Sequence, residues 1–341
     1  MKFLIYISEA YSIPIGRPLQ KEIKKRGYEV KWFCDEDETQ NAFSASEDVL
    51  LSVKEVMKYK PEVVLTATNV VPDFFIGLKV QVFHGFSVGK RNETKGHFNI
   101  RGFFDLYCTQ GPTTTKPFMD LQKKYKYFEV VETGWSKVDP LFPLEQKSIS
   151  IIPTIMISST FTTRLSLAKN LEVVKEIERL TKSGKWNFIA VLHPKMEKEI
   201  VEKFKSFENE YFTFHDTTDL IPLFKQADVM LSDTTSAITE FLLQRKPVVT
   251  MNNNKPASHM INISQAEEIE AALEYALTKP VDIMQNIDDF IEETHPYSDG
   301  KSSKRVIDAC LDFLEHAKMK RKPLNLIRKY KIRKKLKYFK V

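Results

Sequence analysis

Short apolar runs alternate with amphipathic segments along the first half of the chain, and this alternation predicts parallel strands joined by helices. The apolar runs are four to six residues long and end in turn residues. They predict strands at residues 2–8, 28–34, 62–68, 80–85 and 105–111, with helices at 17–27 and 48–61. Continuous apolar runs between helices are typical of a parallel sheet that is covered on both faces.

The alternation restarts after residues 139–148, a segment with two prolines that is typical of a linker. The second half predicts strands at 154–160, 187–194, 211–216, 229–231 and 247–250, and helices at 165–184, 197–207, 219–227, 265–277 and 302–317. We therefore expect an α/β fold with two doubly wound, Rossmann-like domains in the glycosyltransferase-B arrangement. The expected boundaries are 1–145 and 146–317 for the two domains and 318–341 for a tail. A single large α/β domain is the alternative, and it explains the restart less well.

Charge is divided unevenly between the body of the chain and its tail. The whole sequence carries a net charge of +6, but residues 318–341 hold 12 Lys and Arg and no Asp or Glu. Of the 51 bases, 39 therefore remain for the rest of the chain, against 45 acids. A basic tail on an acidic body points to a polyanionic partner for the tail alone.

Apolar residues interleave with the cations of the tail, which favours an anionic membrane surface as its partner. We expect Lys329, Arg333, Lys334 and Lys335 to contact that surface. The apolar residues before position 331 and those after it face roughly opposite sides of a helix, so we expect two short amphipathic pieces or a largely electrostatic anchor. The alternatives are a disordered tail without a target and a tail that binds nucleic acid, which the acidic body disfavours.

Three features set the expected compartment. No run reaches the roughly 18 apolar residues of a membrane span, and the N-terminus reads as a strand and not as a signal peptide. Cys34, Cys108 and Cys310 lie far apart in the sequence, which is typical of reduced thiols and of neither a disulfide framework nor a zinc site. We therefore expect a cytoplasmic protein that lies peripherally at the inner face of the cell membrane.

A polar turn separates a buried strand from a helical pattern at residues 232–236. Asp233, Thr234, Thr235 and Ser236 would stand at the start of a helix, where free backbone N–H groups and hydroxyl groups together can hold phosphate. The alternative is a plain N-cap, because Ser and Thr are common caps. The place of the turn, at the carboxyl end of a strand, favours the phosphate site.

One histidine in each half directly follows a predicted strand. His84 precedes Gly85 and a loop that contains Lys90, and His193 precedes a proline. A histidine at the carboxyl end of a strand is placed to reach a ligand, and its near-neutral pKa suits a general base. The alternative for His84 is a core histidine that bonds to a backbone carbonyl. Neither histidine has the i, i+4 spacing of a helical metal site, so we expect no metal ligands.

Other segments give weaker indications. Lys301 and Ser302 lie in a turn before the last helical pattern, where they could hold phosphate oxygens or form an ordinary solvated helix start. Asp35 and Asp37 form an Asp-x-Asp triplet, but the acidic run around them favours a solvated loop over a metal–nucleotide site. No GxxxxGK[ST], GxGxxG or GxSxG segment is present, which disfavours a P-loop, a dinucleotide site and a hydrolase elbow. We expect no cofactor.

Six segments match, in order, the pattern of one enzyme family. They are VFHG with a following Lys, GWSKVDPLF, SSTFTTR, the pair His193-Pro194, SDTTSAITEFLLQRKPVV and DGKSSKRV. In these motifs the chain resembles the CDP-glycerol glycerophosphotransferase family, whose members prime and polymerise teichoic acids. The matches run from about residue 80 to residue 317 and leave the first 80 residues and the tail uncovered. Thr234 stands where the family usually has Tyr.

The resemblance implies a transferase that moves a polyol phosphate, such as glycerol phosphate, from a CDP-activated donor to a hydroxyl of a cell-surface glycan or lipid-linked acceptor. It implies an N-terminal domain that binds the acceptor near Gly85 and Lys90, and a C-terminal domain that binds the donor. His84 would take the acceptor's proton, and His193 would steady the pyrophosphate or protonate the leaving phosphate. The residues implied to hold the donor's phosphates and nucleotide are Arg164, Asp233, Thr234, Thr235, Ser236, Lys301 and Ser302.

Two other functions stay open. A sugar-nucleotide-dependent glycosyltransferase of the same fold is the second hypothesis, because a fold does not fix the group that is transferred. A protein that binds nucleic acid through its tail and has no catalytic activity is the third.

Overall fold

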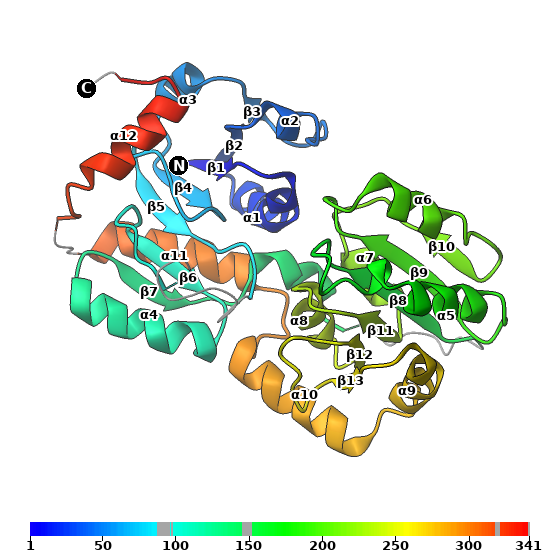
Figure 1. Ribbon diagram of the computed structural model, residues 1–341. Coiled ribbons are helices and arrows are strands. Elements are labelled where there is room, and N and C mark those ends of the chain that lie inside the picture. The colour runs from blue at the N-terminus through cyan, green and yellow to red at the C-terminus, as the bar shows by residue number, and fades with distance from the viewer. Residues whose placement is uncertain (87–95, 97, 145–151, 318–320, 340–341) are drawn as a thin grey trace. The chain divides into compact units, whose positions relative to one another are not determined.

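The structure is a computed structural model that describes residues 1–86, 96, 98–144, 152–317 and 321–339. The chain divides into two compact units. Unit 1 consists of Met1–Pro143 and Glu293–Val341, and unit 2 consists of Leu144–Glu292. Each unit is built on its own parallel sheet (Figure 1).

Unit 1 contains a seven-stranded sheet in which the paired strands are parallel. Its strands are β1 (Lys2–Ile7), β2 (Glu29–Cys34), β3 (Val49–Leu50), β4 (Val63–Thr66), β5 (Leu78–Gln81), β6 (Leu106–Thr109) and β7 (Glu129–Glu132). Their order is β3-β2-β1-β4-β5-β6-β7, so the chain changes its direction of progress across the sheet between β1 and β4. Doubly wound sheets bind ligands beyond the carboxyl ends of the strands at such a switch point.

Helices cover both faces of this sheet. They are α1 (Ile13–Lys25), α2 (Asp37–Gln40), α3 (Val53–Tyr59), α4 (Pro112–Tyr125), α11 (Ser302–His316) and α12 (Leu326–Lys335) (Figure 1). α3, α4 and α12 pack on the face that carries Leu4 and Val64, whereas α1 and α11 pack against each other and against the sheet. Gly16 lets α1 approach the sheet closely, because a Cβ atom at this position would collide with the ring of Trp32.

The last predicted helix, 302–317, belongs to unit 1 and not to the second domain in which the expected boundaries placed it. A short 3-10 helix (Ser136–Leu141) holds the start of α11, because the carboxylate of Asp139 accepts the backbone N–H groups of Ser302 (2.8 Å) and Ser303 (2.7 Å). Burial raises the pKa of Asp139, and these hydrogen bonds oppose the rise. An ion pair between Arg26 of α1 and Asp308 of α11 (2.8 Å) fixes the helix further.

Unit 2 contains a six-stranded sheet whose paired strands are also parallel. Its strands are β8 (Thr154–Ser159), β9 (Asn187–Leu192), β10 (Phe212–Phe214), β11 (Val229–Ser232), β12 (Val248–Met251) and β13 (Ile261–Ile263). The order β10-β9-β8-β11-β12-β13 repeats the plan of unit 1, with the switch point between β8 and β11. The expected pair of Rossmann-like domains is therefore confirmed.

The helices of unit 2 lie on both faces of its sheet. α5 (Leu171–Thr181), α6 (Lys198–Lys205) and α9 (Ile269–Leu277) share one apolar core with alternate residues of β8, β9, β11 and β12. α7 (Ile221–Gln226) contacts β8, and α8 (Ala237–Leu242) contacts β11. The rings of Phe224 in α7 and Phe241 in α8 pack edge to face, 5.7 Å apart. α10 (Val281–Thr294) leads the chain back to unit 1.

Some elements differ from the prediction. The helix predicted at 48–61 begins later, because Val49–Leu50 pairs with β2 as β3 and Ser52 caps α3 by accepting the N–H group of Glu55. The prediction omits α4, α10, β7 and β13. β13 has only three residues, and all four residues of β7 are partly exposed, so neither shows a buried apolar run.

We predict that Asp139→Ala lowers the free energy of unfolding by about 2–4 kcal/mol, because two buried N–H groups at the start of α11 lose a charged acceptor. Urea denaturation followed by tryptophan fluorescence measures the change, since Trp32 and Trp135 are buried in unit 1. Asp120→Ala is the control, because that carboxylate is exposed and its loss changes stability by no more than about 0.5 kcal/mol. Equal effects of the two substitutions would contradict the capping role.

Candidate functional site

The switch point of unit 2 is occupied by the carboxylate of Asp233, which directly follows β11 and is fully buried. Four groups donate hydrogen bonds to it. Ser159 donates through its hydroxyl (2.6 Å), and Thr160, Leu167 and Thr234 donate through their backbone N–H groups (3.1, 3.0 and 2.5 Å). Burial raises the pKa of Asp233, and the four donors oppose this by stabilising its charged form.

This geometry changes the role expected for Asp233. Its side chain points into the protein, so it does not contact a ligand directly. It joins the end of β8 to the turn after β11 and thereby fixes both loops. Asn253, in the loop after β12, adds to the same junction by donating to the backbone carbonyl of Asp233 (2.6 Å).

The turn after Asp233 keeps several hydrogen-bond donors available. Within the part of the chain that the structure describes, the N–H groups of Thr235 and Ser236 and the hydroxyl of Ser236 have no hydrogen-bond partner. The hydroxyl of Thr234 accepts the N–H group of Asn254 (3.2 Å), and that of Thr235 accepts the N–H group of Ala237 (3.4 Å). Ser236 stands at the N-cap position of α8 but makes no capping bond with its side chain.

The prediction of a helix start at this turn is therefore met only in part. α8 has six residues, so the contribution of its dipole is small, and an anion would be held by individual N–H and hydroxyl groups. The alternative of a plain N-cap formed by Ser236 is not what the structure shows. Ser236 is exposed, and its hydroxyl makes no bond to the helix's own amides.

The loop after β8 carries Arg164. Both ends of this loop are bonded to Asp233, through the N–H groups of Thr160 and Leu167. Arg164 lies in the turn between them, is exposed, and has no ion pair or hydrogen bond from its guanidinium among the described residues. Asp233 thus ties the loop that carries Arg164 to the turn with the unpaired N–H groups, and a guanidinium group on such a loop suits the binding of phosphate oxygens.

His193 follows β9, the neighbour of β8, and its ring packs against Phe161 of the Arg164 loop with 4.5 Å between centroids. Its Nδ1 atom accepts the N–H group of Lys195 (3.0 Å). Nδ1 therefore carries no proton, and the neutral ring has its proton on Nε2. Burial, followed by the charge of Lys195, lowers the pKa of His193. The neutral ring with an Nε2–H donor is thus the favoured form near pH 7.

In unit 1, His84 lies just beyond the carboxyl end of β5. Its Nδ1 atom is 3.3 Å from the backbone carbonyl of Ala67, the residue that follows β4. A carbonyl only accepts, so Nδ1 is the donor and the lone pair of the neutral ring is on Nε2. The contact is the one expected of a core histidine, but the ring is only partly buried. The ring of Tyr11, beyond β1, is 6.4 Å away.

Two side chains hold the segment around His84. The indole Nε1 of Trp135 donates to the carbonyl of Phe83 (3.2 Å), and Gln110 donates to the carbonyl of Gly85 (2.9 Å). Phe83 has a φ of 59°, in the left-handed region that a bulky residue rarely adopts. Gly85 has open space where a side chain would stand. Lys90 lies outside the described residues.

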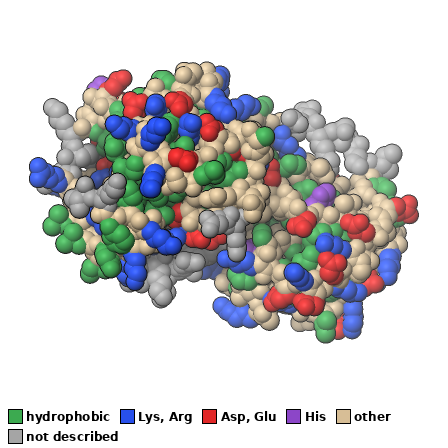
Figure 2. Space-filling model, turned by 90° about the horizontal axis from the view of Figure 1, so that it is seen from above, with side chains coloured by type: hydrophobic (Ala, Val, Ile, Leu, Met, Phe, Trp, Pro, Cys, Tyr) green, Lys and Arg blue, Asp and Glu red, His purple; other side chains and the backbone are tan. Residues whose placement is uncertain are grey.

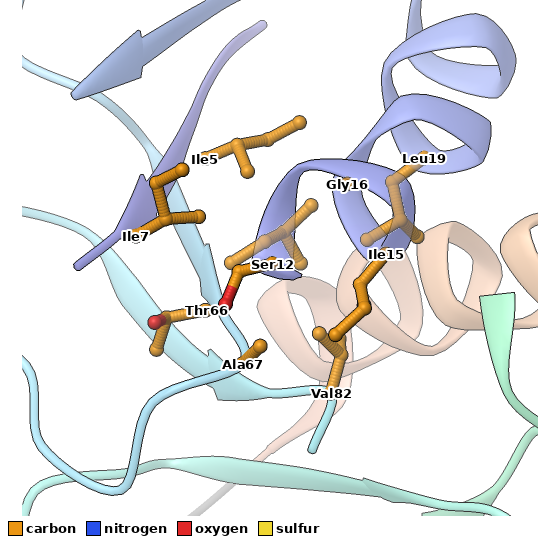
Figure 3. Close-up of a pocket in the computed structure, with 10 residues that line it drawn as sticks. Ile5, Ile7, Ser12, Ile15, Gly16, Leu19, Thr66, Ala67 and Val82 are labelled. Atoms are coloured by element: carbon orange, nitrogen blue, oxygen red, sulfur yellow. The ribbon is translucent and has the colours of Figure 1, made fainter. Parts of the chain in front are cut away.

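A small cavity of about 10 Å³ lies at the switch point of unit 1, between β1, β4 and α1 (Figure 3). Ten residues line it, mostly with apolar atoms: Ile5, Ile7, Ser12, Ile15, Gly16, Leu19, Leu65, Thr66, Ala67 and Val82. The cavity is about the size of one water molecule. It is too small for a substrate.

Lys301 and Ser302 do not join the donor-side residues of unit 2, because they belong to unit 1. Ser302 is 1% exposed, and its N–H group is already bonded to Asp139. The carboxylate of Asp139 thus stands where a phosphate was expected at the start of α11. The exposed side chain of Lys301 makes no hydrogen bond or ion pair among the described residues, while its N–H group donates to Asp299 (3.0 Å).

Sequence reasoning missed several residues that shape these sites. Asn253 and Asn254 bond to the turn at 233–236, and their signal in the sequence is a run of three Asn after a predicted strand. His295 is 1% exposed, accepts the N–H group of Trp135 (3.0 Å), and has its pKa lowered by burial to about 4. Across the described residues, no group of three or more His, Cys, Asp or Glu side chains is placed to hold a metal ion.

Comparison with protein families gives one match. The sequence model of the UDP-N-acetylglucosamine 2-epimerase family matches residues 162–311, which is less than half of the chain. A comparison with curated proteins found no match.

Several solved structures share the fold. A UDP-N-acetylglucosamine 2-epimerase from Listeria monocytogenes, described in its source as putative, aligns with a TM-score of 0.62 at 12% identity over 93% of this chain and 97% of its own. The wall teichoic acid polymerase TagF aligns with a TM-score of 0.67 at 12% identity over 92% and 89%. S. aureus MnaA in complex with UDP aligns with a TM-score of 0.64 at 13% identity over 92% and 97%. At this identity the likeness establishes the fold, which is that of the glycosyltransferase-B class.

We predict that Asp233→Asn lowers the free energy of unfolding by about 2–4 kcal/mol, because an amide NH₂ group faces donors that need an acceptor. Hydrogen exchange measures the local effect, and the amides of Thr160 and Leu167 should exchange faster than in the wild type. Asp282→Asn, on the exposed first turn of α10, should leave both amides unchanged. Protection of Thr160 and Leu167 that survives Asp233→Asn would show that the carboxylate does not hold the loop.

Proposed function

We propose that the protein is an enzyme that acts on a sugar or polyol activated by a nucleoside diphosphate, and that unit 2 binds the pyrophosphate. One observation carries this proposal. Asp233 fixes two neighbouring loops, and these loops present the guanidinium of Arg164, the unpartnered N–H groups of Thr235 and Ser236 and the unpartnered hydroxyl of Ser236. The Nε2–H group of His193, on the adjacent strand, adds a neutral donor. A diphosphate needs such convergent donors.

We propose further that the reaction is the transfer of a polyol phosphate from a CDP-activated donor to a hydroxyl of a cell-surface glycan or lipid-linked acceptor. In this reaction the acceptor oxygen bonds to the phosphorus that bears the polyol, while the bond from that phosphorus to the oxygen of CMP breaks. CMP leaves with the electron pair, and His84 takes the acceptor's proton on Nε2. Arg164, Ser236 and His193 stabilise the charge on the phosphates. The six ordered motifs and the likeness in fold to TagF support this choice.

The match of residues 162–311 to an epimerase family favours a second candidate, inversion of an N-acetylhexosamine linked to UDP. One experiment separates the two. The protein is incubated in D₂O with UDP-N-acetylglucosamine, and separately with CDP-glycerol, CDP-ribitol and hydroxyl acceptors. Deuterium at sugar C2 supports the epimerase, and release of CMP with formation of a phosphodiester supports the transferase. Transfer of a sugar from a sugar nucleotide to an acceptor would support the glycosyltransferase. If the protein catalyses neither epimerisation, nor polyol-phosphate transfer, nor sugar transfer, the proposal is contradicted.

We predict that the double variant Thr235→Ala/Ser236→Ala raises the Kd for CDP and UDP by about tenfold or more, because hydrogen bonds to charged phosphate oxygens are lost. Isothermal titration calorimetry measures the Kd. The free energy of unfolding should change by less than about 1 kcal/mol, because Ser236 makes no capping bond and Thr235 loses only the long bond (3.4 Å) that its hydroxyl accepts from Ala237. Thr213→Ala, which removes an exposed hydroxyl from β10, should leave the Kd unchanged. If the double variant is less stable but binds nucleotide with the wild-type Kd, the turn has a structural role and does not bind the nucleotide.

We predict that His84→Ala and His193→Ala each lower the turnover rate by about 100-fold or more, with little effect on folding. Their glutamine variants should differ. His193→Gln should recover part of the rate, because an amide can replace an Nε2–H donor, whereas His84→Gln should not, because an amide is no base. Steady-state kinetics with the active donor measure both. Wild-type rates in both alanine variants, or rescue of His84 by Gln, would exclude the assigned roles.

A further inference from the structure

The basic tail is docked on unit 1, and three of its cations are used in doing so. Lys335 of α12 contacts Asp35 (2.8 Å) and Glu36 (2.6 Å) at the end of β2. Two further ion pairs join Arg333 to Asp73 (2.8 Å) and Lys322 to Asp105 (2.7 Å). Asp35, expected in a solvated loop, is in fact buried, with its side chain 2% exposed.

Apolar contacts fix which face of α12 points inward. Ile332 packs against the core of unit 1, and the ring of Tyr338 stacks on Phe74 with 4.5 Å between centroids. Asn325, which precedes the helix, donates to the carbonyl of Arg101 (2.6 Å). Within its described residues, 321–339, the tail thus forms one helix of ten residues. It does not form the two short amphipathic pieces that were one expectation, and the other, a largely electrostatic anchor, stays a prediction. The expectation that its apolar residues face opposite sides before and after position 331 holds for Ile332 and Tyr338, which pack inward, but not for Phe339, whose exposed ring lies beside that of Tyr330.

The outward face of α12 is both apolar and cationic. Leu326, Ile327 and Tyr330 are 69%, 74% and 58% exposed, and the exposed ring of Phe339 lies 6.3 Å from that of Tyr330. Among the described residues, six cations of the tail have no carboxylate partner: Arg321, Arg328, Lys329, Lys331, Lys334 and Lys337. Arg333 and Lys335, expected at a membrane, are instead paired with unit 1.

We propose that this outward face of α12 binds an anionic lipid surface while the helix stays docked on unit 1. Unpaired cations near an anionic leaflet favour binding electrostatically, and exposed Leu, Ile and Tyr side chains enter the headgroup region. A nucleic acid would use the cations but would gain nothing from Leu326 and Ile327. The body does not offer a competing basic surface on the face seen in Figure 2, where Lys and Arg side chains are mixed with Asp and Glu. No helix in the described ranges is long and apolar enough to cross a bilayer.

The test uses full-length protein and vesicles of phosphatidylcholine with or without phosphatidylglycerol, and measures binding by co-sedimentation. The wild type should bind only the anionic vesicles, and binding should weaken as salt is raised. Lys331→Gln/Lys334→Gln should lower the association constant about 25-fold, at about fivefold for each cation. Leu326→Ser/Ile327→Ser should lower it at least about tenfold.

Matched controls separate this face from general charge and hydrophobicity. Lys21→Gln/Lys25→Gln removes the same charge from exposed positions on α1, and Leu51→Ser/Leu171→Ser removes two equally exposed leucines elsewhere. Both should bind like the wild type. The proposal is overturned if no vesicle is bound or if the controls lose as much binding as the α12 variants. A third outcome also overturns it: Leu326→Ser/Ile327→Ser binds vesicles normally, whereas Lys331→Gln/Lys334→Gln loses binding both to vesicles and to single-stranded RNA. That result would indicate a general site for polyanions.

Discussion

The carboxylate of Asp233 is removed from water, and a buried charge is costly unless hydrogen bonds replace the lost solvent. The chain meets this requirement at the switch point of unit 2, with donors from the end of β8, from the loop after it and from the turn after β11. Satisfying one charge therefore orders two loops made largely of small polar residues. The donors that Asp233 does not use are then held at the edge of the sheet, which is the condition for binding an anion without a glycine-rich loop.

A second buried carboxylate, that of Asp139, fixes a structural contact in unit 1. Asp139 accepts the first N–H groups of α11, so the helix start that could have held a phosphate is already neutralised by the protein itself. Two segments that look like separate signatures in the sequence, GWSKVDPLF and DGKSSKRV, are thus two halves of one structural contact. The resemblance they carry is consequently weaker evidence for donor binding than the segments of unit 2, in which the side chains of Arg164 and Ser236 remain exposed.

Local sequence patterns predict the elements whose position depends on burial. They fail where a residue distant in the sequence determines the local structure. β1, β8 and β9 were predictable because each is an apolar run that the sheet buries. The turn at 233–236 and His193 were identifiable because each follows such a run. The role of Asp139 was not, since its partner is 163 positions away. Asp35 lies in a run of acids that is typical of a solvated loop, and its burial depends on two distant partners, Tyr6 of β1 and Lys335 of the docked tail. Spacing in sequence carries no information on such pairings.

The two histidines look equivalent in the sequence, but their neighbours assign them opposite chemistry. The N–H group of Lys195 occupies Nδ1 of His193 and leaves the proton on Nε2, so the outer nitrogen is a donor. In His84, the Nδ1–H group donates a hydrogen bond to the carbonyl of Ala67, which leaves the lone pair on Nε2, so that nitrogen is an acceptor. The lowered pKa of His193 strengthens the distinction, because the ring is rarely protonated near pH 7 and so seldom carries a second proton to give, whereas the neutral ring still donates through Nε2–H. Of the two roles first considered for His193, the backbone therefore favours steadying the phosphates over protonating the leaving group.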